Sequence, residues 1–389
     1  QTLNIDTYNI TFTATKPNYY ASQQNQTITI TGGQIKSETQ TTPENNTKLY
    51  REPLQQNQEN SFALTTTNIT DEFDQEFLPV NYAIAINNTE IQTGSIETLP
   101  TTLPNITVEN QNTGTQPITI TYTSPGYTPS TDTFTYNVQG TLTPFNIQGT
   151  EAYISHPNQT KETGNITFSL QDDQNNLISN ADATVTLNTT TSGTCQNLTE
   201  TTTGTYTCTY NLGGEEPLGP TSITIEPTKQ NYISNTTTNG EFTIRDTAQL
   251  EITDETQFSV FRNETTILTA QAKDSRDNIV DDAQTKCVWD TPDGEQTANM
   301  TDGTCTLLYS PTCSAQVGFK TYSLNQTNYT STYTDILSTN ITREGITRSY
   351  VNLTYTNPED VETPVENSEE INLVLSGTDQ CGEDITENI

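Results

Sequence analysis

Basic residues and histidine are scarce in this sequence. Of its 389 residues, 14 are lysine or arginine and one is histidine, against 48 aspartates and glutamates, so the net charge is −34. A chain this acidic is repelled by phosphate backbones and by anionic membranes, and we expect no nucleic-acid partner. A run of about 18 apolar residues, long enough to span a membrane, is also lacking. We therefore expect membrane attachment only through an anchor that is not present in this chain.

The motifs of catalysis are missing too. The sequence has no G-x-S-x-G, no H-E-x-x-H and no glycine-rich phosphate loop. Its histidine, His156, lies beside Pro157 in "YISHPNQT", which we interpret as a loop. Catalysis requires a nucleophile, a base and an orienting group gathered in a pocket. We expect the protein not to be an enzyme, unless a pocket gathers His156 or a pair of carboxylates.

Apolar residues are few, but they are regularly spaced. They make up 30% of the chain, which is low for a globular domain. They fall at alternate positions in short runs rich in Thr, Ile, Val and Tyr, such as "ITFTAT", "YAIAI", "ITITYT" and "TYTCTY". This alternation is typical of strands with one buried face, and no segment keeps a helical period. The predicted fold class is all-β, with several thin cores.

CxxC pairs, which zinc sites commonly use, are absent, so the cysteines predict disulfides instead. Disulfides stabilise small, lightly cored domains in oxidising compartments. Cys195 and Cys208 have no other cysteine near them and are expected to pair. We expect Cys287 to join Cys305, which leaves Cys313 and Cys381, although pairing of Cys313 with Cys287 or Cys305 stays open.

Acceptor sequences for N-linked glycans, by contrast, are abundant. Asn, then any residue but Pro, then Thr occurs along the whole chain, which is typical of a heavily N-glycosylated extracellular or cell-surface protein. The predicted acceptors are Asn9, Asn25, Asn45, Asn68, Asn87, Asn105, Asn158, Asn165, Asn188, Asn197, Asn235, Asn263, Asn299, Asn325, Asn328, Asn340 and Asn352.

The sequence repeats itself at intervals of about 100 residues, as tandem domains do. "DQNNLISNADATV" from Asp173 aligns with "SRDNIVDDAQTKC" from Ser275, and "TTGTYTCTY" aligns with "TDGTCTLLY". A pattern of strand, tight turn, tyrosine and strand also recurs four times. We assign its tyrosines as Tyr20, Tyr127, Tyr232 and Tyr329.

These repeats divide the chain into three complete domains, residues 33–140, 141–247 and 248–345. Residues 1–32 are expected to be the closing strands of an incomplete domain or strands donated to another subunit. Residues 346–389 are expected to be the opening strands of an incomplete domain. Two explanations stay open: the chain is part of a longer tandem array, or its terminal strands join neighbouring subunits by strand exchange.

The aligned segments resemble the immunoglobulin-like (Ig-like) repeats of bacterial and archaeal surface proteins, namely the invasin-like and "big" Ig-like domains. Their pattern, D-x-x-G/N-N-x-V followed by a strand and later by G-x-Y-x-x-x-Y, is matched well over 165–210 and 267–309. In this chain Asn176 and Asn278 are taken to replace the usual glycine. The resemblance implies tandem β-sandwiches in a stalk, adhesin, surface layer or filament. The acidic, Thr-rich background is more similar to archaeal than to bacterial examples.

Clusters of acids and amides suggest two alternatives, a calcium site or a bend between strands. Calcium binds several oxygen ligands from short acidic loops and often rigidifies such domain joints. Asp and Asn also accept hydrogen bonds from their own backbone and tolerate positive φ, so a bend selects the same residues. We favour the bend. The candidate residues are Asp172, Asp173 and Asn175; Asp274, Asp277, Asp281 and Asp282; and Asp71, Glu72, Asp74 and Glu76.

Together these features predict a structural subunit of an extracellular, glycosylated filament, stalk or surface layer that self-associates into a polymer or array. The alternative is an adhesin that binds glycans or a partner cell surface. A concave cluster of exposed aromatic side chains on one domain would favour the adhesin.

Overall fold

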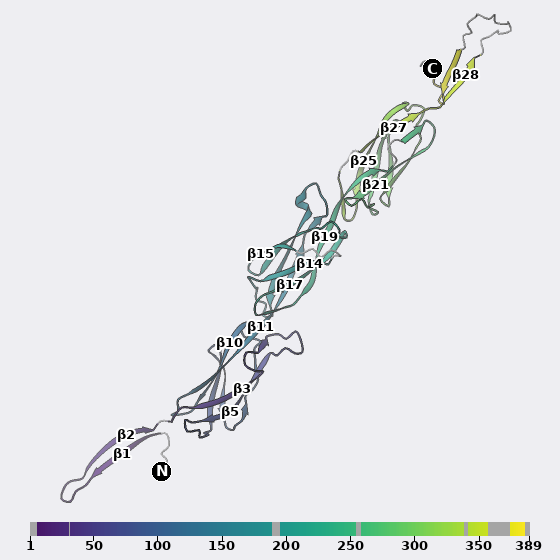
Figure 1. Ribbon diagram of the computed structural model, residues 1–389. Coiled ribbons are helices and arrows are strands. Elements are labelled where there is room, and N and C mark those ends of the chain that lie inside the picture. Colours follow the sequence, from purple (N-terminus) through teal and green to yellow (C-terminus); the bar gives the residue numbers. More distant parts are fainter. Residues whose placement is uncertain are drawn as a thin grey trace, which may run out of the picture.

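The computed structural model describes residues 6–30, 32–188, 195–253, 258–337, 341–356 and 374–385. Over these ranges the regular structure is almost entirely strand, and the one helical element is a single 3-10 turn, η1 (Gln159–Glu162). The predicted all-β fold is confirmed. No helix in the described part of the chain is long and apolar enough to cross a membrane. The strands form a rod of successive units with the two termini at opposite ends (Figure 1).

The first unit is a sandwich of two sheets. One sheet contains β3 (Lys36–Thr42), β5 (Ser61–Thr70) and β8 (Thr101–Thr102), and β9 (Ile106–Thr107) also pairs with β5. The other contains β7 (Thr89–Ile96), β6 (Val80–Ile86), β10 (Gly114–Thr123) and the first half of β11 (Ser130–Gly149), with the short β4 (Lys48–Tyr50) parallel to β11. Alternate apolar residues such as Ile118, Ile120 and Tyr122 fill a core that runs from Ile35 to Val138.

The second unit has the strand order of an immunoglobulin constant-type sandwich. Its first sheet runs β15 (Gln196–Thr202), β16 (Thr205–Asn211), β13 (Thr163–Asp172) and the second half of β11. Its second sheet runs β14 (Asp182–Leu187), β17 (Gly219–Thr228) and β19 (Thr237–Ile252), with β12 (Glu151–Tyr153) parallel to β19. The core between the sheets extends from Leu142 to Ile244.

The third unit differs from the second in one strand. The end of β19, β21 (Thr266–Asp274) and β24 (Thr304–Tyr309) lie on one side, and β23 (Gly294–Thr301) pairs with β24 at two positions and with β22 (Gln284–Thr291) of the other side at six. On the other side lie β22, β25 (Gly318–Thr330) and β27 (Ile341–Arg348), with β20 (Phe258–Phe261) parallel to β27. The core runs from Ala248 to Leu324 and contains Trp289.

The units are joined by continuous strands. β11 is the last strand of the first unit and the first strand of the second, and β19 does the same between the second and third units. Two short strands reinforce these joints. β18 (Tyr232–Ser234), which precedes β19, lies parallel to β11, and β26 (Thr334–Ile336), which precedes β27, lies parallel to β19. Domain joints built this way bend less than joints made by a flexible linker.

The rod ends in two hairpins. β1 (Asp6–Ala14) pairs with β2 (Ser22–Ile30) at the amino-terminal end, and β28 (Val351–Thr356) pairs with β29 (Val374–Asp379) at the other end (Figure 1). The register of β1 and β2, with Ala14 opposite Ser22, matches that of β10 and β11, with Tyr122 opposite Ser130. The hairpin β1–β2 is therefore the counterpart of the last two strands of a complete unit.

One sequence assignment in this hairpin is wrong. The left-handed turn residue is Asn18, with a φ of 71°, and the recurring tyrosine that follows it is Tyr19 and not Tyr20. The N–H of Tyr19 donates to a carbonyl three residues earlier, as the N–H of Tyr127 does in the first unit. Tyr20 is fully exposed. Two adjacent tyrosines cannot be told apart by sequence pattern, whereas the turn geometry identifies the equivalent position.

Candidate functional site: acidic turns at the domain junctions

The acidic clusters form one turn that occurs four times. It begins where β5, β13, β21 and β29 end, at Asp71, Asp172, Asp274 and Asp379. In each copy the aspartate Oδ1 accepts hydrogen bonds from the backbone N–H groups two and four residues later, at 2.8–3.0 Å. These carboxylates therefore satisfy N–H groups that the strands leave unpaired, which is the hydrogen bonding that a bend beginning with aspartate uses.

The fourth residue of each turn is left-handed. Asp74, Asn175, Asp277 and Gly382 have φ values of 60°, 63°, 69° and 79°. Asp and Asn are the non-glycine residues that adopt this conformation most readily. The sequence-based placement of the glycine position at Asn176 and Asn278 is thus one residue too late. The side chains of those two asparagines instead donate to the aspartate that opens their turn.

Each turn lies at the end of its unit that faces the preceding one. The junction before the first unit is called the first junction, and those before the second, third and terminal units are the second, third and fourth. At the second junction Arg51, from the first unit, donates to Asp172 at 3.0 Å and to Asp173 at 2.8 Å. All three side chains are at most 6% exposed. Arg51 follows β4 and Asp172 ends β13, so the ion pair joins two units.

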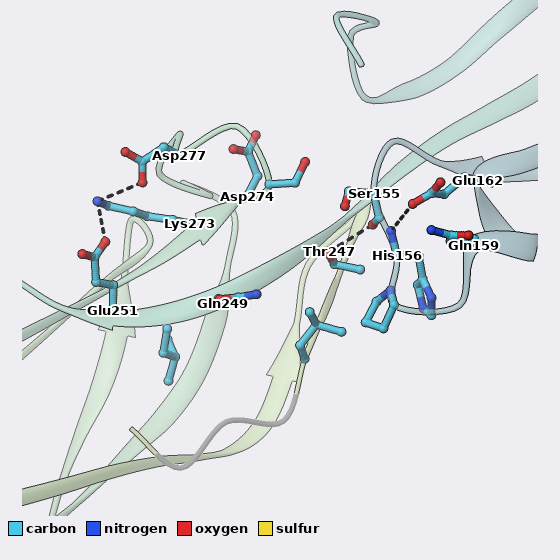
Figure 2. Close-up of a pocket in the computed structure, with 14 residues that line it drawn as sticks. Ser155, His156, Gln159, Glu162, Thr247, Gln249, Glu251, Lys273, Asp274 and Asp277 are labelled. Carbon is cyan, nitrogen blue, oxygen red and sulfur yellow. Dashed lines mark hydrogen bonds and ion pairs between the residues drawn. The ribbon is translucent and has the colours of Figure 1, made fainter. Parts of the chain in front are cut away.

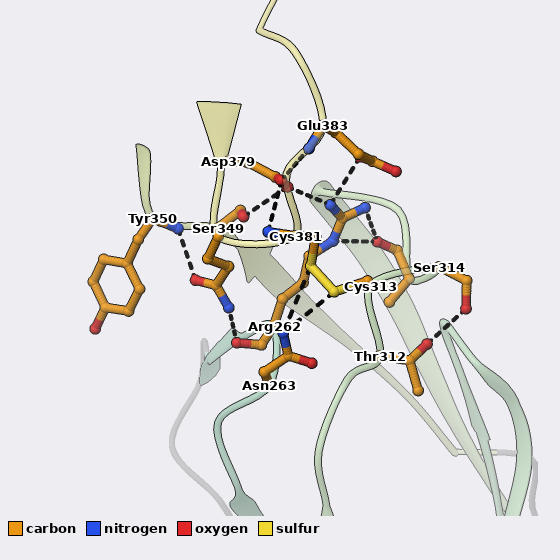
Figure 3. The surroundings of a disulfide bond; sticks show 12 residues. Arg262, Asn263, Thr312, Cys313, Ser314, Ser349, Tyr350, Asp379, Cys381 and Glu383 are labelled. Carbon is orange, nitrogen blue, oxygen red and sulfur yellow. Dashed lines mark hydrogen bonds and ion pairs between the residues drawn. A yellow bond between two sulfur atoms is a disulfide. The ribbon is translucent and has the colours of Figure 1, made fainter. Parts of the chain in front are cut away.

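The fourth junction has the same design and adds a covalent link (Figure 3). Arg262, which follows β20, donates to Asp379 at 2.6 Å and to Glu383 at 3.1 Å, and its Nε donates to the carbonyl of Ala315 at 2.7 Å. Cys381, in the same turn, is bonded to Cys313 of the third unit. This disulfide therefore cross-links two successive units.

The third junction places its arginine in a different position. Ile154 occupies the position after β12 that corresponds to Arg51 and Arg262, since its N–H also donates to the end of the last strand of its unit. The cation comes instead from the turn itself: Arg276 lies 3.3 Å from Asp274 and donates to the carbonyl of Glu216 in the second unit at 3.0 Å. An arginine thus bridges units at the second, third and fourth junctions.

The electrostatic environment favours the ionised carboxylates. Burial alone would raise the pKa of Asp172, but the backbone of Asn176 and the guanidinium of Arg51 outweigh it, so the pKa is lowered. Burial also opposes ionisation of Asp274, yet hydrogen bonds from Asn278 and Arg276 lower its pKa. The pKa of Asp379 is lowered, mainly by the backbone N–H of Glu383. Hydrogen-bond donors to the charged form are the common cause.

The calcium candidates are held by donors of the protein itself. Asp173 accepts from Thr141 and Arg51, and Asp282 accepts from Ser331 and Thr332. Asp277 pairs with Lys273 at 3.2 Å, and Asp281 is exposed. Within the ranges that the structure describes, no group of three or more His, Cys, Asp or Glu side chains is arranged to hold a metal ion.

A polar cavity of about 790 Å³ lies beside the third junction (Figure 2). It is lined by His156 and Glu162 from the second unit and by Lys273 and Asp277 from the third. The Nδ1 of His156 accepts from the backbone N–H of Asn158, and Glu162 accepts from the backbone N–H of His156. Both side chains therefore bind their own loop. Lys273 forms ion pairs with Glu251, at 2.6 Å, and with Asp277.

The other cysteines brace individual units. Cys195 is bonded to Cys208, on β16, with a Cα–Cα distance of 5.7 Å. Cys287, on β22, is bonded to Cys305, on β24, with a Cα–Cα distance of 6.5 Å. Cys208, Cys287 and Cys305 are buried, so these bonds reinforce the cores of the second and third units.

The glycan acceptor asparagines lie on the surface. Of those that the structure describes, only Asn68 and Asn235 are half-buried and the others are exposed. The Nδ2 of Asn235 donates to Thr143 at 3.2 Å, and that of Asn263 lies 3.2 Å from Cys313. Asn340 lies outside the described residues.

Two parts of the junction site were not identified from sequence. One is the pair Arg51 and Arg262. A signal for them was present, because each follows an apolar and an aromatic residue in a short run, "KLYR" and "SVFR", in a chain with few arginines. The other is the equivalence of 71–75 with the later turns, which the different residues between the aspartate and the left-handed position conceal.

No protein-family model matches this chain, and no curated protein matches it either. Among solved structures, a three-Ig structure of titin domains is 11% identical, covers 82% of this chain and 98% of its own, and has a TM-score of 0.48. The Escherichia coli adhesin FdeC is 14% identical over 81% of this chain and 99% of its own, with a TM-score of 0.35. The Yersinia pseudotuberculosis adhesin InvE is 18% identical over 52% of this chain and 58% of its own, with a TM-score of 0.24. The description of this chain as Ig-like repeats rests on its own strand order.

Proposed function

We propose that this chain is a structural, load-bearing part of an extracellular, N-glycosylated stalk, filament or surface layer. The observation that carries the proposal is the construction of its junctions. Continuous strands cross two of them, and an arginine bridges the units at three. These features hold neighbouring units in line, which is what a mechanical element requires.

Several further properties support an extracellular location. The chain has three disulfides. Disulfides form and persist in oxidising compartments and are rare in the cytosol. The exposed acceptor asparagines are available to a glycosylation system that acts on secreted proteins. A net charge of −34 and surface glycans both oppose pairing of exposed sheet edges with other chains.

The role that we propose is not catalytic. In the cavity beside the third junction, His156 and Glu162 are bound to their own loop, and Lys273 is bound to two carboxylates. This arrangement supplies no activated nucleophile among the described residues. An origin in an archaeal surface structure remains part of the proposal on the basis of the sequence resemblance.

Electron microscopy of native surface material, together with mass spectrometry of its glycopeptides, tests the proposal. Repeating density that accommodates successive sandwiches, with sugar on the exposed asparagines, is the expected result. Monomeric, unglycosylated particles would refute it. Glycan binding by isolated chains, with no repeating structure at the surface, would favour the adhesin alternative.

A further inference from the structure

The hairpin β1–β2 presents a core face that no described residue covers. Its register places Ile10 and Phe12 where β10 has Ile118 and Ile120, both of which are buried in the first unit. Phe12, in contrast, is 55% exposed, and Ile28 on β2 is 41% exposed. A two-stranded hairpin is at best marginally stable alone in water. This face is therefore expected to pack against the remaining strands of a sandwich.

The first junction also contains a turn without an arginine. Asp71 makes the same two backbone hydrogen bonds as Asp172, and Asp74 has the same left-handed conformation as Asn175. Among the described residues, however, no lysine or arginine forms an ion pair with Asp71. The nearby Lys36 pairs instead with the exposed Asp74.

A glycine also lies beside the acidic turn at this junction. At the second junction a Cβ on Gly140 would overlap Arg51 and Asp173, so the absence of a side chain there makes room for the ion pair. At the first junction a Cβ on Gly33 would overlap the side chain of Glu72, which corresponds to Asp173. The Glu72 side chain lies against the same glycine surface that receives the guanidinium at the second junction.

The complete units specify the strand that would bring this arginine. Arg51 and Arg262 both follow short edge strands, β4 and β20, that run parallel to the last strand of their unit. In each strand the apolar residue two positions before the arginine, Leu49 or Val260, is buried in the core. A strand of this type beside β2 would cover part of the bare face and point its arginine at the Asp71 turn.

We infer that β1–β2 and the Asp71 turn bind a partner domain: an Ig-like sandwich, lying outside residues 1–389, that lacks its own last two strands and carries an arginine after an edge strand. The inference deepens the proposed function, on which it rests, by specifying what docks at this end.

The carboxy-terminal hairpin of a second copy does not satisfy this requirement. β28–β29 offers an exposed apolar surface, with Leu353 57% and Val351 53% exposed, so it could contact β1–β2. Yet the sequence after Arg348 contains no lysine or arginine. Strand exchange between the two ends would bring no arginine to Asp71 and Glu72, whose carboxylates Lys36 does not reach because it bonds to Asp74 and to the carbonyl of Glu72.

Hydrogen exchange with mass spectrometry tests the docking on two samples: recombinant chain 1–389, and the protein isolated from its natural surface without denaturant. Amides of 6–30 and 72–76 are expected to exchange rapidly in the recombinant chain and at least about ten-fold more slowly in the natural material. The turn 172–176 is the internal control and should be protected equally in both. Equally fast exchange of 6–30 in both samples would overturn the docking.

The variant Asp71→Asn tests the arginine, because it keeps the Oδ1 acceptor of the turn and removes only the charge. In the recombinant chain it should leave stability unchanged, whereas the matched variant Asp172→Asn should destabilise the second junction. Introduced into the natural protein, Asp71→Asn should reduce the protection of 6–30. Unchanged protection would exclude the arginine contact, even if the proposed surface structure is intact in micrographs.

The two exchange experiments are independent of the glycan and microscopy tests, so failure of this inference can be told apart from failure of the proposed function.

Discussion

Replacement of Arg51 by methionine is the sharpest test of the junction design. Arg51→Met keeps an unbranched side chain of similar length but removes the only guanidinium on Asp172 and Asp173 among the described residues. These carboxylates are 3% and 6% exposed, so water cannot replace the lost cation without opening the junction. Breaking a buried ion pair by removing one partner costs about 3–5 kcal/mol. We expect a loss of that size in the stability of the second junction.

The matched control is Lys36→Met at the first unit. Lys36 pairs with Asp74 at 2.7 Å, but these side chains are 52% and 80% exposed. Exposed ion pairs contribute about 0–1 kcal/mol, because water solvates both charges in the variant. The two substitutions thus remove the same charge from contrasting environments.

Hydrogen exchange measured by unit is the suitable assay, since a chain of several domains does not unfold in one step. Amides of β13 and of 172–176 should lose protection in Arg51→Met, while those of the third unit should not change. The pH dependence adds a second readout. A protonated Asp172 no longer needs its counter-ion, so the effect of the substitution should shrink as the pH falls towards about 4. A loss no larger than that of Lys36→Met, or one that is independent of pH, would refute the argument.

Four other predictions follow from the same structure. The double variant Cys313→Ser/Cys381→Ser removes a cross-link with a sequence separation of 68, and should destabilise the terminal unit by up to about 4 kcal/mol while the second unit keeps its exchange protection. The stability of the wild-type chain should be constant from neutral pH to about 5 and should decrease once the pH is lower than the unfolded aspartate pKa of about 3.9. The reason is that the pKa values of Asp172 and Asp274 are lowered in the folded chain, so the stability that their ionised forms contribute is lost as they protonate. A melting midpoint that rises on acidification would contradict this. Chelator should leave the melting temperature unchanged, since N–H groups and arginines already occupy the carboxylates of the turns; a clear rise on adding calcium would establish a metal site instead. Glycopeptide analysis of the natural protein should find Asn235 less occupied than the exposed Asn165, because Asn235 is half-buried and its Nδ2 is bonded to Thr143; equal occupancy would show that the local structure forms after glycan transfer.

Local sequence patterns predicted the local structure well. Alternation of apolar residues in "ITITYT" and "TYTCTY" predicts strands because successive side chains of a strand point to opposite faces, and these segments form β10 and β16. The bend at 172–176 was also predictable from local sequence, because Asp and Asn side chains form hydrogen bonds with the backbone within a few residues of their own position. Where the pattern was ambiguous, as for the adjacent Tyr19 and Tyr20, the turn geometry was needed.

Contacts between distant residues were not accessible in this way. Arg51 lies 121 residues from Asp172, and Arg262 lies 117 residues from Asp379. The contact between Arg51 and Asp172 depends on two separate strand pairings. β4 must lie parallel to one half of β11, and β13 must lie antiparallel to the other half. No local pattern encodes that combination.

The sequence by itself determined that this chain forms β-sheets in repeating units, that bends begin with aspartate, and that the surface carries glycan acceptors, because alternation, turn chemistry and short motifs act over a few residues. Only the tertiary structure decided what the acidic bends do. They face the preceding unit. A buried arginine from across the junction pairs with Asp172 and Asp379, and Arg276 of the turn itself pairs with Asp274, whereas no arginine among the described residues pairs with Asp71.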